Sequence, residues 1–89
     1  MSKKLTFTVT KDPSVATEEI AAKPAVQVIF GNYVTAGTIL SSDIGSTSDA
    51  NVTNDEIVFK DSASYQSYMD EIGDDPLNPG FTISNLVLS

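Results

Sequence analysis

The stretch 61–73, DSASYQSYMDEIG, predicts the clearest helix in this chain and thereby its fold class. Its apolar side chains recur three and four positions apart, which places them on one helical face. Asp61 or Ser62 can cap the amino end, and Gly73 can end the helix. A helix with one apolar face has to cover a second element, and the rest of the chain offers a sheet. The face consists of Tyr65, Tyr68, Met69 and Ile72.

Strand patterns lie at both ends of the chain. Residues 3–10, KKLTFTVT, alternate apolar residues with threonine, which is typical of an antiparallel strand with one buried face. Residues 81–89, FTISNLVLS, begin with the same alternation, but Leu86, Val87 and Leu88 are apolar in succession. We therefore expect this end of the strand to be covered on both faces, and in so small a chain a neighbouring subunit could supply the cover.

The middle of the chain is punctuated by turn residues. Residues 25–40 predict a β-hairpin, because two β-prone runs flank Gly31–Asn32, a pair suited to a type II′ turn. Residues 11–24 predict a loop with at most one helical turn. EIVF at 56–59 predicts a short strand, and Pro79–Gly80 suits the centre of a type II turn.

Together these patterns predict a single α+β domain over residues 1–89. It has a small, mainly antiparallel sheet of four to five strands and one α-helix near residues 62–72. The expected order is strand, hairpin, short strand, helix, strand. A β-sandwich or barrel with a helical appendage is the alternative.

The composition excludes many function classes. The chain has no cysteine and no histidine, so it lacks the thiolate nucleophile, the commonest general base and the commonest transition-metal ligands. It also lacks arginine, which is favoured for binding phosphates and guanine edges. We therefore expect no enzyme activity, no cofactor or metal, and no nucleic-acid partner. No segment has the apolar run of an export signal or of a membrane span, so we expect neither a membrane partner nor export from the cytoplasm.

Charge is distributed unevenly along the chain, whose net charge is -7. The first 40 residues carry four lysines against three acidic residues, whereas the remaining residues carry one lysine against nine acidic residues. This asymmetry leaves two kinds of partner open: a basic protein, or a second copy bound through unlike ends.

The segment 41–55 is polar and invites two chemical interpretations. Asp43-Ile44-Gly45-Ser46 resembles the Asp-Thr-Gly-Ser motif of aspartic proteases, whose small retroviral members are homodimers. The resemblance implies a dimeric hydrolase that uses Asp43, but Ile44 stands where the family has a hydroxyl residue. Two such carboxylates must also share a proton in a dry site, and this segment is expected to be solvated.

A calcium loop is the other interpretation. Oxygen-bearing residues stand at alternate positions, as they do in calcium loops. However, an EF-hand needs glycine where Asn54 stands and a bidentate acid where Lys60 stands, so only a looser site stays open. We expect 41–55 to be a long loop between two strands, which is either a contact arm toward another protein or an inert connection. The oxygen-bearing residues are Asp49, Asn51, Thr53, Asp55 and Glu56.

A cluster of acidic residues follows the predicted helix: Asp70, Glu71, Asp74 and Asp75. Negative charge at a helix C-terminus opposes the helix dipole, and no adjacent lysine compensates it. The cluster is either a solvated face that keeps the protein soluble or a contact for lysines of a partner. The tyrosines and Met69 of the same helix are interpreted as core residues rather than as a binding stripe.

These observations favour a non-enzymatic structural or protein-interaction protein. In composition, the chain resembles small virion proteins of tailed bacteriophages, such as capsid decoration (cement) proteins or tail components. The resemblance implies many copies bound to a repeating surface of a capsid or tail protein, possible homo-oligomers, and a location in the virion; otherwise the protein is expected in the cytoplasm. A small acidic regulator or inhibitor of a basic protein is the alternative. The expected contact residues are Asp43, Asp49, Asp55, Asp70, Glu71, Asp74, Asp75, Leu86 and Leu88.

Overall fold

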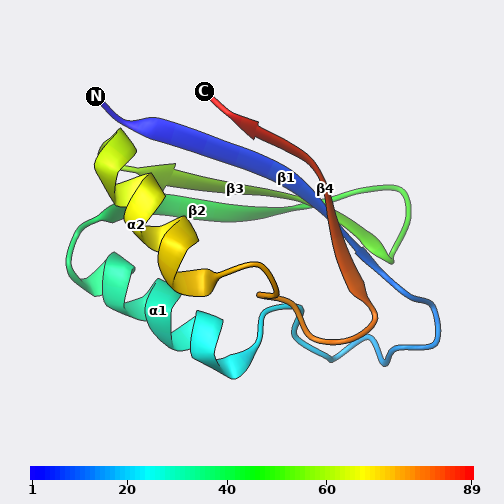
Figure 1. The fold of residues 1–89 in the computed structure, drawn as a ribbon. Coiled ribbons are helices and arrows are strands. Elements are labelled where there is room, and N and C mark those ends of the chain that lie inside the picture. Colours follow the sequence, from blue (N-terminus) through cyan, green and yellow to red (C-terminus); the bar gives the residue numbers. More distant parts are fainter.

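The computed structural model describes all 89 residues and confirms the α+β class (Figure 1). Four antiparallel strands form one sheet, and two helices accompany it. In chain order the elements are β1 (Lys3–Lys11), α1 (Pro24–Thr35), β2 (Ile39–Ser46), β3 (Val52–Phe59), α2 (Ser62–Ile72) and β4 (Phe81–Leu88).

The strand order in the sheet is β2-β3-β1-β4. The connection from β1 through α1 to β2 passes over β3, which lies between these two strands. The connection from β3 through α2 to β4 passes over β1 in the same way. This is the split β-α-β arrangement, also called the ferredoxin-like topology. As a result β2 and β4 are the two edge strands, and the predicted order with a hairpin and one helix is wrong in detail.

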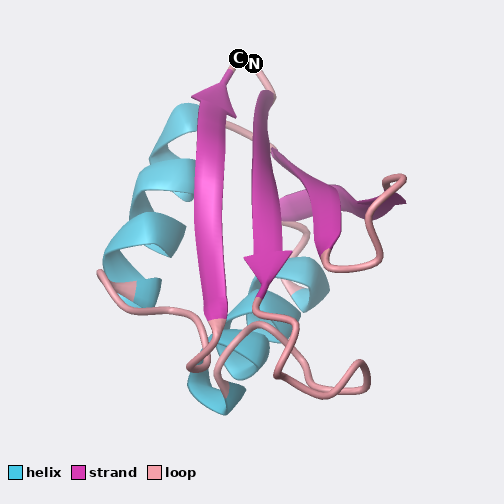
Figure 2. Ribbon diagram, turned by 90° about the vertical axis from the view of Figure 1, so that its right-hand side faces the viewer, coloured by secondary structure: helices cyan, strands magenta, loops and turns pink.

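The core lies between one face of the sheet and the two helices, which also contact each other (Figures 1 and 2). Leu5 on β1 pairs with Ile57 on β3, and both point toward the helices. Phe59, two residues further along β3, is the one large side chain that is completely buried. The rings of Tyr65 and Tyr68 on α2 stand edge-on or tilted against it, with centroids 5.7 and 5.4 Å away.

Helix α2 has the predicted bounds, 62–72, and the predicted ends. The side chain of Asp61 accepts a hydrogen bond from the backbone N–H of Ser64 at 2.8 Å, which satisfies a free donor of the first turn. Gly73, with φ 72°, ends the helix. Tyr68 is buried, and the other residues of the predicted apolar face pack against the core, so the interpretation of this face as core is confirmed.

Strands β1 and β4 are also confirmed, and so is the turn before β4. The N–H of Phe81 bonds to the carbonyl of Asn78, and Gly80 has φ 90°, as a type II turn centred on Pro79–Gly80 requires. A side chain on Gly80 would additionally collide with Val15.

The hairpin predicted at 25–40 is wrong, because residues 24–35 form helix α1. Pro24 occupies the first helical turn, where its missing N–H is not needed. Gly31 lies within the helix instead of in a turn. Contact with the core outweighs the β-propensity of the valines and isoleucine, because one helical face meets α2 and the sheet. That face consists of Val26, Ile29, Phe30 and Tyr33. Residues 12–23 form the expected loop.

The long loop expected at 41–55 is likewise wrong, because β2 and β3 form a hairpin there. The turn spans 47–51, where the side chain of Asp49 accepts a hydrogen bond from the N–H of Asn51 at 2.9 Å. The strand at 56–59 accordingly begins earlier, at Val52. The residues of β2 are mostly polar because this strand is mostly exposed. Its backbone pairing with β3 keeps it in the sheet.

Candidate interaction surface on strand β4

The apolar end of β4 lies on the surface of the protein. Ile83, Leu86, Val87 and Leu88 are 38, 46, 54 and 39 % exposed. The expectation that this end is covered on both faces is therefore wrong within a single chain. Since β4 is an edge strand, it has a neighbour on one side only, and the helices pack chiefly against the opposite half of the sheet.

The backbone of β4 is free along its outer side. Lys4 and Ser89 exchange two backbone hydrogen bonds of 2.8 Å, which places the chain termini side by side (Figure 2). Because peptide groups alternate in direction along a strand, the N–H and C=O of Leu88 point away from β1. The outer side of β4 therefore offers unpaired donors and acceptors to another strand.

Residues 81–89 contain no charged side chain and no proline. Edge strands of natural proteins are normally protected from unwanted pairing by lysines, prolines, inward-pointing charges or bulges. Here only a bulge is present: the register with β1 shifts between Thr6 and Thr8, and Asn85 has φ 54°. The bulge divides β4 into two regular segments, and both remain available.

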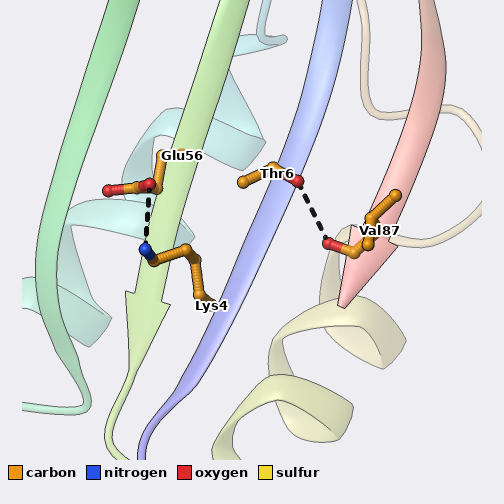
Figure 3. Close-up of polar contacts among 4 residues, drawn as sticks. All are labelled: Lys4, Thr6, Glu56 and Val87. Carbon is orange, nitrogen blue, oxygen red and sulfur yellow. Dashed lines mark hydrogen bonds and ion pairs between the residues drawn. The ribbon is translucent and has the colours of Figure 1, made fainter. Parts of the chain in front are cut away.

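The face of the sheet away from the helices is polar. Lys4 and Glu56 form an exposed ion pair of 3.6 Å, and the Thr6 hydroxyl donates to the carbonyl of Val87 at 3.5 Å (Figure 3). A shallow hollow of ≈ 360 Å³ lies on this face, with Asp43 and Glu56 among its lining residues. The acidic lining disfavours nucleotide binding, which relies in part on positive charge.

Asp43 is exposed in the middle of β2, opposite Glu56 on β3. The residues that resemble the aspartic protease motif therefore lie in a regular strand and not in a loop that could pair two aspartates in a dry site. The geometry gives the hydrolase interpretation no support.

The oxygen-bearing residues of the calcium interpretation do not converge on one point. Asp49 and Asn51 belong to the turn, where Asp49 is engaged in the hydrogen bond that closes it. Thr53, Asp55 and Glu56 follow one another along β3. No three acidic side chains are grouped where they could hold a metal ion.

Asp55 has an unusual position. It alternates with Ile57 and Phe59 and so faces the helix-covered side, and its Oδ1 is buried without a hydrogen-bond partner. Burial raises the pKa of Asp55; a hydrogen bond from Thr53 opposes the rise, and the nearby charge of Asp43 adds to it. Asp55 is partly buried and therefore lies in an unfavourable environment for a charged group.

The acidic cluster is partly occupied within the chain. Asp75 pairs with Lys23 at 2.7 Å, and Glu71 accepts a hydrogen bond from the Tyr33 hydroxyl. That hydrogen bond raises the pKa of Tyr33. Glu71 thus links α2 to α1, and Asp75 links the turn after α2 to the residue before α1. Asp70 and Asp74 are the two carboxylates of the cluster without a partner in the chain.

A second hollow, of ≈ 420 Å³, lies beside the first turn of α2. The N-terminus of a helix can bind anions, but here the Asp61 carboxylate already accepts hydrogen bonds from Ser64. These bonds lower the pKa of Asp61 and keep it charged. An external anion would therefore meet a negative charge at this position.

The structure does not bring the nine expected contact residues together. They are distributed over the middle of β2, its hairpin turn, β3, the end of α2 and β4. Leu86 and Leu88 are exposed as a contact requires, whereas the sequence analysis missed Ile83 and Val87. The absence of charge over 81–89 is the signal that could have identified them.

Comparison with models of protein families, with curated proteins and with solved structures finds no match to this chain. Neither helix has the length and apolar character needed to cross a membrane.

Proposed function

We propose that this protein is a non-enzymatic structural protein that associates with other protein subunits along the outer side of β4. The observation that carries the proposal is the edge itself: an eight-residue strand with no charge, an unpaired backbone and four exposed apolar side chains. A strand in this condition is suited to strand addition, in which main-chain hydrogen bonds supply affinity and apolar side chains supply the register.

The remaining surface supports this role. The net charge of -7 disfavours unspecific association between copies. Exposed apolar side chains also occur on α1 and β2, but of the two edge strands only β4 carries no charged residue. The compositional resemblance to phage decoration and tail proteins suggests the form that such association takes: many copies attached to a repeating protein surface in a virion.

The native assembly state of the chain tests this proposal. The untagged protein is followed through gel filtration of an extract from its natural source, because a tag at either terminus would lie beside β4. We expect the chain to elute in fixed stoichiometry with a much larger protein assembly. Recovery as a free single chain at all concentrations would overturn the proposal.

Two matched variants link the assembly to β4. Val87→Lys and Leu40→Lys place the same charge on opposite edges of the sheet, at positions that are 54 and 57 % exposed. We expect Val87→Lys to move the protein into the free fraction and Leu40→Lys to leave it in the assembly. Equal retention of both variants would exclude β4 as the binding edge.

A further inference from the structure

We propose that the strand that pairs with β4 is the β4 of a second copy, running antiparallel about a two-fold axis. This inference rests on the proposed function, which makes β4 the binding edge, and adds the identity and the direction of the partner strand. The result is a closed dimer in which two four-stranded sheets become one sheet of eight strands.

The charge at the two ends of β4 favours the antiparallel direction. At the Leu88 end lie Lys3 and Lys4, of which Lys4 pairs with Glu56. At the Phe81 end the acidic residues outnumber the lysines. Antiparallel pairing therefore places the lysine-rich end of one copy beside the acidic end of the other, whereas parallel pairing would place like ends together.

The acidic end is built by two loops that meet there. The N–H of Asp12 bonds to the carbonyl of Gly80, and the N–H of Lys23 bonds to the carbonyl of Pro76. The lysines of this end are already engaged: Lys23 pairs with Asp75, and Lys11 is buried and donates to backbone carbonyls. Apart from Asp75, which pairs with Lys23, the acidic residues of these loops are Asp12, Glu18, Glu19 and Asp74.

Charge also favours a second copy as the partner. Two chains of net charge -7 repel each other, so they can approach closely only where neither presents an acidic side chain, and β4 is such a surface. A basic protein would be drawn to the acidic faces instead. Pairing of β4 with the other edge of a second copy would bring in Asp43 on β2 and would continue without end, whereas pairing of β4 with β4 closes after two copies.

The bulge is compatible with this arrangement. It separates the regular segments Phe81–Ser84 and Val87–Leu88. When two β4 strands overlap completely and run antiparallel, the first segment of each copy meets the second segment of the other, and both bulges lie near the two-fold axis. In this register Thr82 lies opposite Val87 of the second copy, and both side chains are on the polar face of the sheet.

Light scattering of the purified chain over a concentration series tests the dimer. We expect the mass to rise to that of two chains for the wild type and for Leu40→Lys. For Val87→Lys we expect dimerisation weaker by at least about tenfold, because a lysine on an edge strand opposes pairing with another strand. Circular dichroism should show all three proteins equally folded. A wild type that stays monomeric throughout, or equal dimerisation of the two variants, would overturn the inference.

Cysteine cross-linking tests the direction independently of these variants, since the chain has no native cysteine. Thr82→Cys and Val87→Cys are purified separately, mixed and oxidised. We expect the mixed disulfide between the two variants to form several times faster than either self-linked product. Predominant self-linking of each variant would indicate parallel strands and contradict the inference.

The outcomes also separate this inference from the proposed function. If the purified chain is monomeric but enters its native assembly through β4, another protein supplies the partner strand: the second-copy inference fails and the proposed function stands. If the chain dimerises through β4 but elutes from its natural source as that dimer alone, the inference stands and the role in a larger assembly fails.

Discussion

Replacing Phe59 with alanine should remove a large part of the stability of this domain. Phe59 is fully buried, and its ring contacts the rings of Tyr65 and Tyr68, so its loss opens a cavity where α2 meets the sheet. A buried phenylalanine truncated to alanine costs about 3–5 kcal/mol. A domain of 89 residues has a total stability of about 4–13 kcal/mol. With nine residues buried in all, this domain belongs toward the lower end of that range.

Urea unfolding followed by far-ultraviolet circular dichroism measures this loss. We expect Phe59→Ala to lower the free energy of unfolding by about 3–5 kcal/mol, or to leave the chain unfolded without urea. Leu40→Ala is the control, because its side chain is more than half exposed on the other edge of the sheet, and it should change stability by about 0.5 kcal/mol or less. A loss below about 1 kcal/mol for Phe59→Ala, or equal losses for both variants, would refute the assignment of the core.

Three further predictions concern Asp55, Tyr68 and Gly31. Because the pKa of Asp55 is raised in the folded state, its charged form destabilises the fold as the pH rises above the ordinary aspartate range. Asp55→Asn should therefore increase the free energy of unfolding by at most about 1 kcal/mol at neutral pH and leave it unchanged in acid. Urea unfolding at both pH values measures this difference. Burial raises the pKa of Tyr68 to about 12, so its phenolate absorbance should appear only near that pH, and the domain should lose stability between about pH 10 and 12. Ionisation of Tyr68 near pH 10 in the folded protein would contradict its burial. Gly31→Ala should raise the free energy of unfolding by about 1 kcal/mol, because Gly31 is exposed within α1 and a side chain there meets no neighbour, and a decrease would show that α1 is wrongly placed.

Helix α2 was predictable because its local features agree with one another. Asp61 supplies a cap, Gly73 supplies an end, and the apolar residues between them have the helical period. Strand β1 was predictable for the same reason, since its alternation coincides with one buried face. In these segments the tertiary structure selects the same conformation as the local sequence.

Helix α1 and the β2–β3 hairpin could not be predicted in the same way. In α1, the β-branched residues and the pair Gly31–Asn32 favour a hairpin locally, and burial of Phe30 and its neighbours against α2 decides for a helix. In β2 and β3, alternation is weak because much of the hairpin is exposed on both sides. Those strands are held by backbone hydrogen bonds, which leave no recognisable pattern in the side-chain sequence.

The candidate site was predictable only in part. The apolar run Leu86–Leu88 led to Leu86 and Leu88, but a sequence cannot show that β4 is an edge strand, because this depends on the sheet order. The acidic residues attracted attention as a group, although two of them pair with Lys23 and Tyr33 of the same chain. Such long-range pairs have no signature in one sequence.

Amide hydrogen exchange of the protein in its native assembly tests the central claim most directly. The outward N–H groups of β4, including that of Leu88, are free in the isolated chain and should be protected once another strand pairs with them. The amides on the outer side of β2 serve as the control, because β2 is the other edge of the same sheet. Our account predicts slow exchange along β4 and fast exchange along β2. Equally fast exchange at both edges would contradict it.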